Sequence, residues 1–180
     1  MPPCIFNPCE RTLMIFYLIA CAIIIAADQL TKLLAVIFLA PITTLPLIPK
    51  VFHLTYVENT GAAFSLLAGR SVFLILLTAA LIAALIVLLI RQPKTRAARP
   101  LNFALTMVIG GALGNLLDRL HYGYVVDFFD CRIIGFAVFN VADCFVVVGC
   151  VLVVASILRA PGLAEEPDAA PREKKRRPRA

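Results

Sequence analysis

The sequence has little charge and no tryptophan, and it lacks the polar residues with which soluble proteins face water. Only 16% of its 180 residues are charged, 61% are hydrophobic, and the mean hydropathy is +0.92. A soluble domain averages about 25% charged and about 45–50% apolar residues. So few polar residues cannot cover a water-soluble core. The composition argues against a disulfide scaffold, a disordered chain and a nucleic-acid-binding domain, and it indicates one small integral membrane domain.

Combinations of metal-ligating and nucleophilic residues are also scarce. The only histidines are His53 and His121, and the six cysteines form no CxxC pair and no Cys/His cluster. Because a metal site needs several such ligands at close spacing, we expect no metal and no cofactor. The serine, cysteine and metal routes of peptide hydrolysis lack their parts for the same reason.

Four stretches are apolar enough to cross a bilayer, which takes about 20 residues of helix. We expect these spans at residues 13–27, 71–90, 101–117 and 133–158. The first span reaches Ala40 if Lys32 extends its amine to the interface. The sequence therefore predicts an all-α membrane fold of four transmembrane helices over residues 11–160. We expect an N-terminal extension at residues 1–10 and a disordered basic cytoplasmic tail at residues 161–180.

Most of the 17 Lys and Arg residues lie on one side of these spans. They precede the first span, fill the loop 91–100 and crowd the C-terminal tail, whereas residues 41–70 and 119–132 hold few. Basic loops stay in the cytoplasm, so both termini are expected there. The acids Asp28, Glu58, Asp118, Asp127, Asp130 and Asp143 then all lie in outer loops or in the outer half of a span.

The outer segments have the composition of β-strands. Residues 51–57 are rich in β-branched and aromatic side chains, Asn59, Thr60 and Gly61 supply a turn, and residues 62–67 form a second apolar run. Residues 125–129 have the same character and are expected to continue the sheet. We therefore expect a small extracytoplasmic β element on the outer face of the membrane, which would cradle a peptide or a lipid.

Two spans carry polar residues at helical spacing. Asn115, Asp118 and Arg119 share one face of the third span, and Asn140 and Asp143 share a face of the fourth. Asp143 is expected about 15 Å below the outer end of its helix, and less if that helix begins later than residue 133. A carboxylate at that depth costs several kcal/mol unless it is partnered or neutralised.

A second carboxyl that shares one proton with Asp143 is the favoured solution. Lys32 and Arg119 each have a nearer acid, Asp28 and Asp118, so neither is free to pair with Asp143. Two carboxyls sharing a proton are what aspartic peptide hydrolysis uses.

Two acids are candidates for the second carboxyl. Arg119 would hold Asp118 ionised, whereas the apolar neighbours of Asp127 would raise its pKa and suit it to proton sharing. This favours Asp127, with Asp118 as the alternative.

Five blocks of the sequence resemble, in the same order, the signature motifs of the lipoprotein signal peptidases (signal peptidase II). They are residues 28–32, 59–64, 110–119, 125–128 and 139–143. The resemblance implies a bacterial inner-membrane aspartyl endopeptidase that removes signal peptides from diacylglyceryl-modified prolipoproteins, cutting before the lipidated cysteine. It maps the catalytic pair onto Asp127 and Asp143.

The same resemblance implies roles for other residues. Asn59, Asn115, Arg119 and Asn140 match polar positions that line the substrate site, Asp118 matches a supporting acid, Gly61 matches a turn, and Asp28 and Lys32 match a structural pair. Cys144 departs from the small hydroxyl residue of many relatives. We expect a monomer that meets a prolipoprotein and membrane lipid, and no nucleic acid.

Two other classes of membrane protein were weighed against the peptidase. A small proton- or ion-coupled carrier would use Asp143 as its transit site. A non-catalytic assembly subunit would use glycines and asparagines to join helices. The carrier is disfavoured because nothing protonatable lies in the inner halves of the last three spans.

Overall fold

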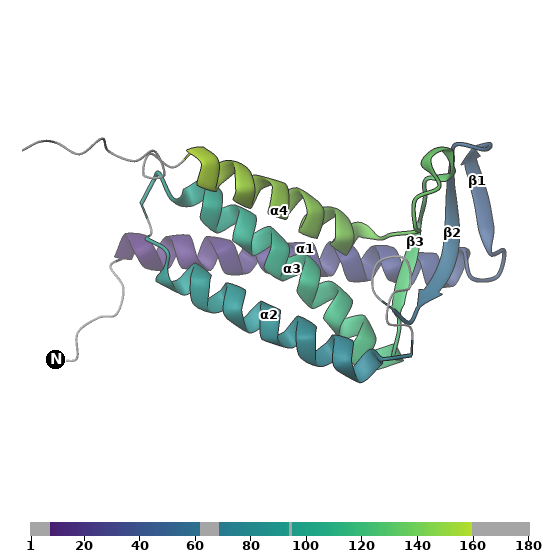
Figure 1. The fold of residues 1–180 in the computed structure, drawn as a ribbon, viewed down its shortest axis with the longest axis horizontal. Helices are drawn as coiled ribbons and strands as arrows, with labels where there is room; N and C mark the ends of the chain where they lie inside the picture. The colour runs from purple at the N-terminus through teal and green to yellow at the C-terminus, as the bar shows by residue number, and fades with distance from the viewer. Residues whose placement is uncertain (1–7, 62–68, 94, 160–180) are drawn as a thin grey trace, which may run out of the picture.

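A computed structural model describes residues 8–61, 69–93 and 95–159 of the chain. The elements in order are α1 (Pro8–Phe38), β1 (Thr44–Ile48), β2 (Phe52–Asn59), α2 (Ser71–Arg91), α3 (Arg99–Tyr122), β3 (Val125–Asp130), the short 3-10 helix η2 (Arg132–Ile134) and α4 (Val141–Arg159). Figure 1 shows the four long helices side by side, with the three strands standing across one end. The predicted fold of four helices with a small β element is confirmed.

The outward faces of the helices are apolar. All four are long and hydrophobic enough to cross a membrane, and α2 carries no charge between Ser71 and its last residue, Arg91. Large side chains such as Leu18, Leu81 and Val151 are more than half exposed. A helix that is hydrophobic on its exposed face is stable in lipid and not in water. The protein is therefore a multi-pass membrane protein.

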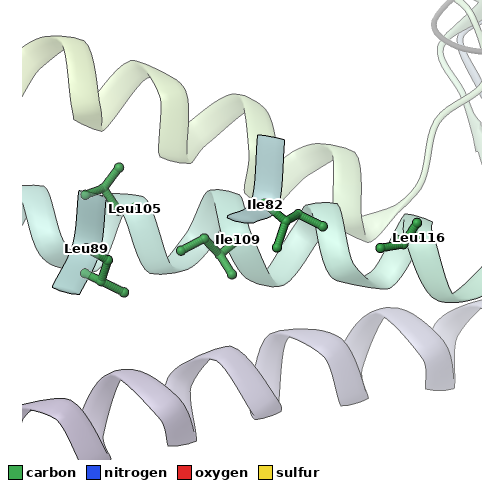
Figure 2. Packing of buried hydrophobic residues seen from close by; sticks show 5 residues of the cluster. All are labelled: Ile82, Leu89, Leu105, Ile109 and Leu116. Carbon is green, nitrogen blue, oxygen red and sulfur yellow. The ribbon is translucent and has the colours of Figure 1, made fainter. Parts of the chain in front are cut away.

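The α3 helix lies at the centre of the bundle and packs against the other three helices. Figure 2 shows the cluster that joins it to α2, made of Leu105, Ile109 and Leu116 on α3 with Ile82 and Leu89 on α2. This apolar interface holds α2 against the rest of the bundle.

Glycines let α1 and α4 approach α3 closely. A Cβ at Gly110 would lie 2.9 Å from Ile24 of α1, and a Cβ at Gly111 would lie 2.5 Å from the backbone oxygen of Ala142 in α4. Small residues at such contacts allow close packing between transmembrane helices. The approach matters because Ala142 precedes Asp143.

The sheet has the order β1-β2-β3 with both pairings antiparallel. The strands predicted at residues 51–57 and 125–129 are confirmed as β2 and β3. The β1 strand was not predicted. Its Pro46 is tolerated because β1 is an edge strand of the sheet. The second apolar run, residues 62–67, lies outside the described residues.

The α1 helix ends at Phe38, close to the longer end at Ala40 that the sequence allowed. Two other helix boundaries differ from the sequence prediction. The α3 helix continues to Tyr122, where Gly123 adopts φ 81° and ends it. The prediction that the fourth span begins at Ile133 is wrong. There the chain forms η2, leaves it through Gly135 at φ 58°, and starts α4 only at Val141.

Candidate active site

Asn140 and Asp143 together cap the start of α4. The side-chain oxygen of Asn140 accepts a hydrogen bond from the Asp143 backbone nitrogen (3.0 Å), and Asp143 Oδ2 accepts one from the Asn140 backbone nitrogen (3.1 Å). This reciprocal pattern is a capping box, with aspartate in place of the usual glutamate. Asp143 therefore lies in the first turn of α4, at the end of the helix nearest the sheet. The predicted depth of 15 Å below the helix end is wrong.

Asp127 lies in β3 and is only 2% exposed. Its Oδ1 accepts a hydrogen bond from the Asn140 side-chain nitrogen (2.6 Å), and its Oδ2 accepts one from the Asn59 side-chain nitrogen (2.9 Å). Burial disfavours the charged form and raises the pKa of Asp127 to about 6, and the nearby charge of Asp143 acts in the same direction. This agrees with the pKa shift expected from its apolar neighbours.

Asn115 connects the Asp143 carboxylate to a buried lysine. Its side-chain nitrogen donates to Asp143 Oδ1 (2.8 Å), while its side-chain oxygen accepts from Lys32 Nζ (2.8 Å) and from Asn140 (3.1 Å). Because ammonium and amide donors hold the oxygen of Asn115, its amide group is fixed with the nitrogen toward Asp143.

Lys32 lies at the centre of an ion-pair network behind Asp143. The residue is 3% exposed, and besides Asn115 its Nζ contacts Asp28 Oδ2 and Asp118 Oδ2, each at 2.9 Å. All three N–H groups of the ammonium are therefore used. The predicted pair of Asp28 and Lys32 is present. The expectation that Lys32 extends to the interface is wrong, and Asp118 pairs with Lys32 rather than with the adjacent Arg119.

The two acids of this network also tie other elements together. Asp28 Oδ1 accepts a hydrogen bond from the Ala142 backbone nitrogen (2.9 Å), so α1 satisfies an otherwise unpaired N–H at the start of α4. Asp118 Oδ2 accepts one from the Val126 backbone nitrogen (3.2 Å), next to Asp127. Asp28 therefore fixes the backbone beside Asp143, and Asp118 fixes the backbone beside Asp127.

Gln29 is a member of this network that the sequence reasoning missed. Its side-chain nitrogen donates to Asp118 Oδ1 (2.8 Å) and to the backbone oxygen of Gly114 (3.2 Å), which joins α1 to α3. The signal available in the sequence was the adjacent polar pair of Asp28 and Gln29 inside a long apolar run.

Arg119 and Gly61 meet on the side of the site nearest β2. Arg119 Nη2 donates to the backbone oxygen of Gly61 (3.0 Å), and the Gly61 backbone nitrogen donates to the side-chain oxygen of Asn59 (2.9 Å). The turn after β2 is thereby held over the end of α3. It also orients the amide of Asn59 with its nitrogen toward Asp127.

A cavity of about 480 Å³ brings these groups together. Its polar wall is made of Asn59, Asn115, Arg119, Asp127 and Asp143, and the rest of its lining is apolar, mainly from residues 136–139 and 146–148. Asp127 and Asp143 thus face one space, whereas Asp118 lies behind it in the ion-pair network. Among the described residues no group of three His, Cys, Asp or Glu side chains is placed to hold a metal ion.

A family model described as signal peptidase (SPase) II matches residues 20–159 of the chain. The chain belongs to the signal peptidase II family. The lipoprotein signal peptidase of Caldanaerobacter subterraneus is 47% identical over 131 residues, 73% of this chain and 88% of the relative. That of Nostoc sp. is 44% identical over 150 residues, 83% of this chain and 94% of the relative.

Two solved structures of bacterial membrane enzymes share the fold. A bacterial membrane enzyme solved by the in meso method is 27% identical, with a TM-score of 0.71 over 86% of this chain and 94% of that chain. A second such structure has 28% identity and a TM-score of 0.70. Membership of signal peptidase II, an aspartic peptidase family, confirms the predicted resemblance and enzyme class. It favours a peptidase that removes signal peptides from prolipoproteins over the carrier.

Proposed function

We propose that the chain is a membrane aspartic endopeptidase that removes the signal peptides of diacylglyceryl-modified prolipoproteins, cleaving before the lipidated cysteine, with Asp127 and Asp143 as its catalytic pair. The observation that carries the assignment is that both carboxyls line one cavity and both are held by Asn140. Two carboxyls this close to one residue share a proton because both cannot ionise without strong repulsion.

The proton of the pair belongs on Asp127 and the negative charge on Asp143. Asp143 lies in the first turn of α4, where the peptide dipoles of the helix and a backbone N–H stabilise a carboxylate. Asp127 lies on a strand, almost fully buried, and its raised pKa favours the neutral acid. Asp143 is therefore the general base and Asp127 the general acid.

Hydrolysis needs one water molecule between the two carboxyls. The Asp143 carboxylate takes a proton from this water as its oxygen attacks the carbonyl carbon, and Asp127 gives its proton to the carbonyl oxygen. The product is a neutral tetrahedral diol. On collapse, Asp143 passes its proton to the leaving nitrogen and one hydroxyl returns its proton to Asp127. The pair ends with the single proton with which it began.

The neighbouring polar residues hold the pair in this geometry. Asn59 and Asn140 donate to Asp127, and Asn115 and the Asn140 backbone donate to Asp143, so the four carboxylate oxygens are each fixed by one donor. The remaining lone pairs stay available for the water and the shared proton. Arg119 lines the same wall and is placed to bind a substrate carbonyl, beside the turn at Gly61.

The apolar part of the cavity suits a lipidated substrate. Phe136, Val146 and Val147 line it, and Val147 is 61% exposed on the outward face of α4. A substrate carrying acyl chains can therefore place its peptide beside the carboxyls and its lipid along α4 in the bilayer. The site is complete within one chain, which supports a monomeric enzyme.

We place the enzyme in a bacterial inner membrane with both termini cytoplasmic and the active site toward the outer face. The arginines at the ends of the helices opposite the sheet support this orientation, because basic residues stay on the cytoplasmic side. The sheet and both carboxyls then lie near the outer surface, where the start of a translocated lipoprotein emerges.

The test is cleavage of a diacylated and a non-diacylated precursor by the purified protein in detergent. The parent chain is expected to cleave only the diacylated precursor, with no effect of chelators. Asp127→Asn and Asp143→Asn should each abolish cleavage while the protein stays folded. Asp130→Asn, in the same strand but away from the cavity, is the matched control and should cleave normally. If Asp127→Asn or Asp143→Asn cleaves as fast as the parent, the assignment of the catalytic pair is overturned.

A further inference from the structure

A second cavity lies far from the carboxyl pair, between α1 and α3. It has a volume of about 500 Å³ and is lined by Leu13, Phe16, Tyr17, Arg99 and Phe103. The rings of Phe16 and Phe103 lie 6.3 Å apart, and the lining is apolar apart from the Arg99 guanidinium and the Tyr17 hydroxyl. This groove lies at the start of α3, the end of the bundle opposite the sheet (Figure 1).

The end of the bundle that holds the groove is basic. The helix ends and the connection between α2 and α3 bring five exposed arginines there: Arg11, Arg91, Arg96, Arg99 and Arg159. None of the five forms an ion pair among those that the structure records in the described residues. In the described helices Glu10, next to Arg11 in α1, lies at this end, whereas the other acids lie in the active site or the sheet. This end therefore carries an excess of positive charge that attracts an anion.

One residue of the groove, Tyr17, carries a buried polar atom that lacks a partner among the described residues. Tyr17 is 3% exposed, and its hydroxyl makes no hydrogen bond within the described residues. A phenol hydroxyl donates one hydrogen bond, and inside a bilayer no bulk water is present to accept it. Because Tyr17 lines the groove, an acceptor atom on a molecule in the groove would satisfy this hydroxyl.

We infer that the groove between α1 and α3 binds one anionic glycerophospholipid, with its phosphate on Arg99, an ester carbonyl on the Tyr17 hydroxyl and an acyl chain between Phe16 and Phe103. Arg99 begins α3 and Phe103 lies one turn further into the bundle, so the charged group precedes the apolar rings as a lipid headgroup precedes its acyl chains. Basic pockets between transmembrane helices are known binding sites for anionic lipid headgroups. This site is separate from the carboxyl pair and does not depend on the proposed catalytic mechanism.

The test measures binding of defined lipids to the full-length protein in detergent by native mass spectrometry. The probes are phosphatidylglycerol and phosphatidylcholine with identical acyl chains, and inorganic phosphate alone. We expect one phosphatidylglycerol per protein, weaker binding of phosphatidylcholine, and no binding of inorganic phosphate. Equal binding of the two lipids would contradict a charge-selective site, and absence of any bound lipid would overturn the inference.

Three variants locate the bound lipid. Arg99→Gln should weaken phosphatidylglycerol binding about fivefold, the loss expected for one basic residue at a membrane surface. Arg91→Gln, at the same end but on α2 and outside the groove, is the matched control and should change binding little. Tyr17→Phe should weaken both lipids by about threefold, since both carry the ester carbonyl. An equal loss in Arg91→Gln and Arg99→Gln would mean diffuse surface attraction and would overturn the site.

Peptide cleavage gives an independent control for the lipid-site variants. Arg99→Gln lies far from the cavity with Asp127 and Asp143, so its cleavage rate without added phosphatidylglycerol should equal that of the parent. A variant that keeps full cleavage and loses the lipid separates this inference from the proposed function. If the parent binds phosphatidylglycerol but does not cleave the precursor, that result contradicts the proposed function and leaves the lipid site standing.

Discussion

Asn140 contacts both carboxyls of the proposed pair. Its side-chain nitrogen lies 2.6 Å from Asp127 Oδ1, and its backbone nitrogen lies 3.1 Å from Asp143 Oδ2. One residue therefore fixes the strand acid relative to the helix acid. The same residue caps α4, so the geometry of the pair and the start of the helix cannot vary independently.

Asn140→Ser is predicted to separate these two roles. Serine is a good N-cap residue, so α4 should keep its start, and stability should fall only by the loss of the buried amide contacts of Asn140, about 1–3 kcal/mol. Serine lacks the amide that reaches Asp127, and loss of one positioning contact costs about 10²-fold in rate. Cleavage of a diacylated precursor measures the effect. If the rate falls only in proportion to a fall in stability, the amide does not position Asp127.

The raised pKa of Asp127 predicts a pH-dependent stability. The folded protein holds this proton up to about pH 6, whereas an unfolded aspartate loses it near pH 4. The contribution of Asp127 to stability is therefore full below pH 4, falls as the pH rises to about 6 and then stays constant. The total loss is at most about 3 kcal/mol, since each pKa unit corresponds to about 1.4 kcal/mol.

A comparison of variants isolates this effect from other titrating groups. Thermal unfolding of the parent and of Asp127→Asn is measured in detergent from pH 4 to pH 8. The parent should lose stability relative to Asp127→Asn between pH 4 and pH 6, and the difference should then be constant. A difference that does not change with pH would show that Asp127 titrates normally in the folded protein.

The sequence predicted most of the membrane frame because hydropathy and length decide it. The α2 span was placed at residues 71–90 and is Ser71–Arg91. The start of α4 was misplaced because residues 133–139 are apolar enough to continue a helix. The residues that prevent this are Gly135, at a positive φ, and the cap at Asn140. A hydropathy profile gives no weight to either feature.

The residues that line the cavity were predicted better than the contacts between them. Asp127 and Asp143 were predicted from their surroundings and from the family motifs, and they line one cavity; their catalytic roles stay a prediction. The partner of Asp118 was predicted to be its neighbour Arg119, yet it is Lys32, 86 positions away. Sequence spacing identifies neighbours along one helix, but not the contacts between α1 and α3 that decide this pair.

Lys32→Met is predicted to destabilise the protein strongly. Removal of the ammonium leaves Asp28 and Asp118 buried without a cation, and breaking a buried ion pair in this way costs about 3–5 kcal/mol. Lys50→Met, at an exposed lysine in the turn between β1 and β2, is the matched control and should stay within about 0.5 kcal/mol of the parent. Thermal unfolding in detergent compares the two variants.

A double variant tests the physical reason for the Lys32→Met defect. Asp118→Asn added to Lys32→Met removes one of the uncompensated charges, so stability should recover in part. The parent, the two single variants and the double variant form a double-mutant cycle, in which contacting residues show a coupling energy of about 0.5–3 kcal/mol. Strictly additive losses would show that the carboxylates do not need the ammonium.

Gly111→Ala is predicted to impair catalysis from outside the cavity. The new Cβ would lie 2.5 Å from the backbone oxygen of Ala142 and 2.9 Å from Val146, so α4 must move away from α3. Overpacking of this kind costs about 1–3 kcal/mol. Because Ala142 precedes Asp143, the movement also displaces the proposed general base, and a shift of about 1 Å can cost about 10²-fold in rate.

Gly123→Ala provides the contrast for Gly111→Ala. A Cβ at Gly123 meets no atom within 4 Å, so this change strains only the backbone at φ 81°. That strain costs about 1–2 kcal/mol, comparable to the packing defect, but it leaves α4 in place. At equal loss of thermal stability, cleavage of the diacylated precursor should fall sharply in Gly111→Ala and little in Gly123→Ala. Equal loss of cleavage in both would mean that stability, and not the position of Asp143, limits the reaction.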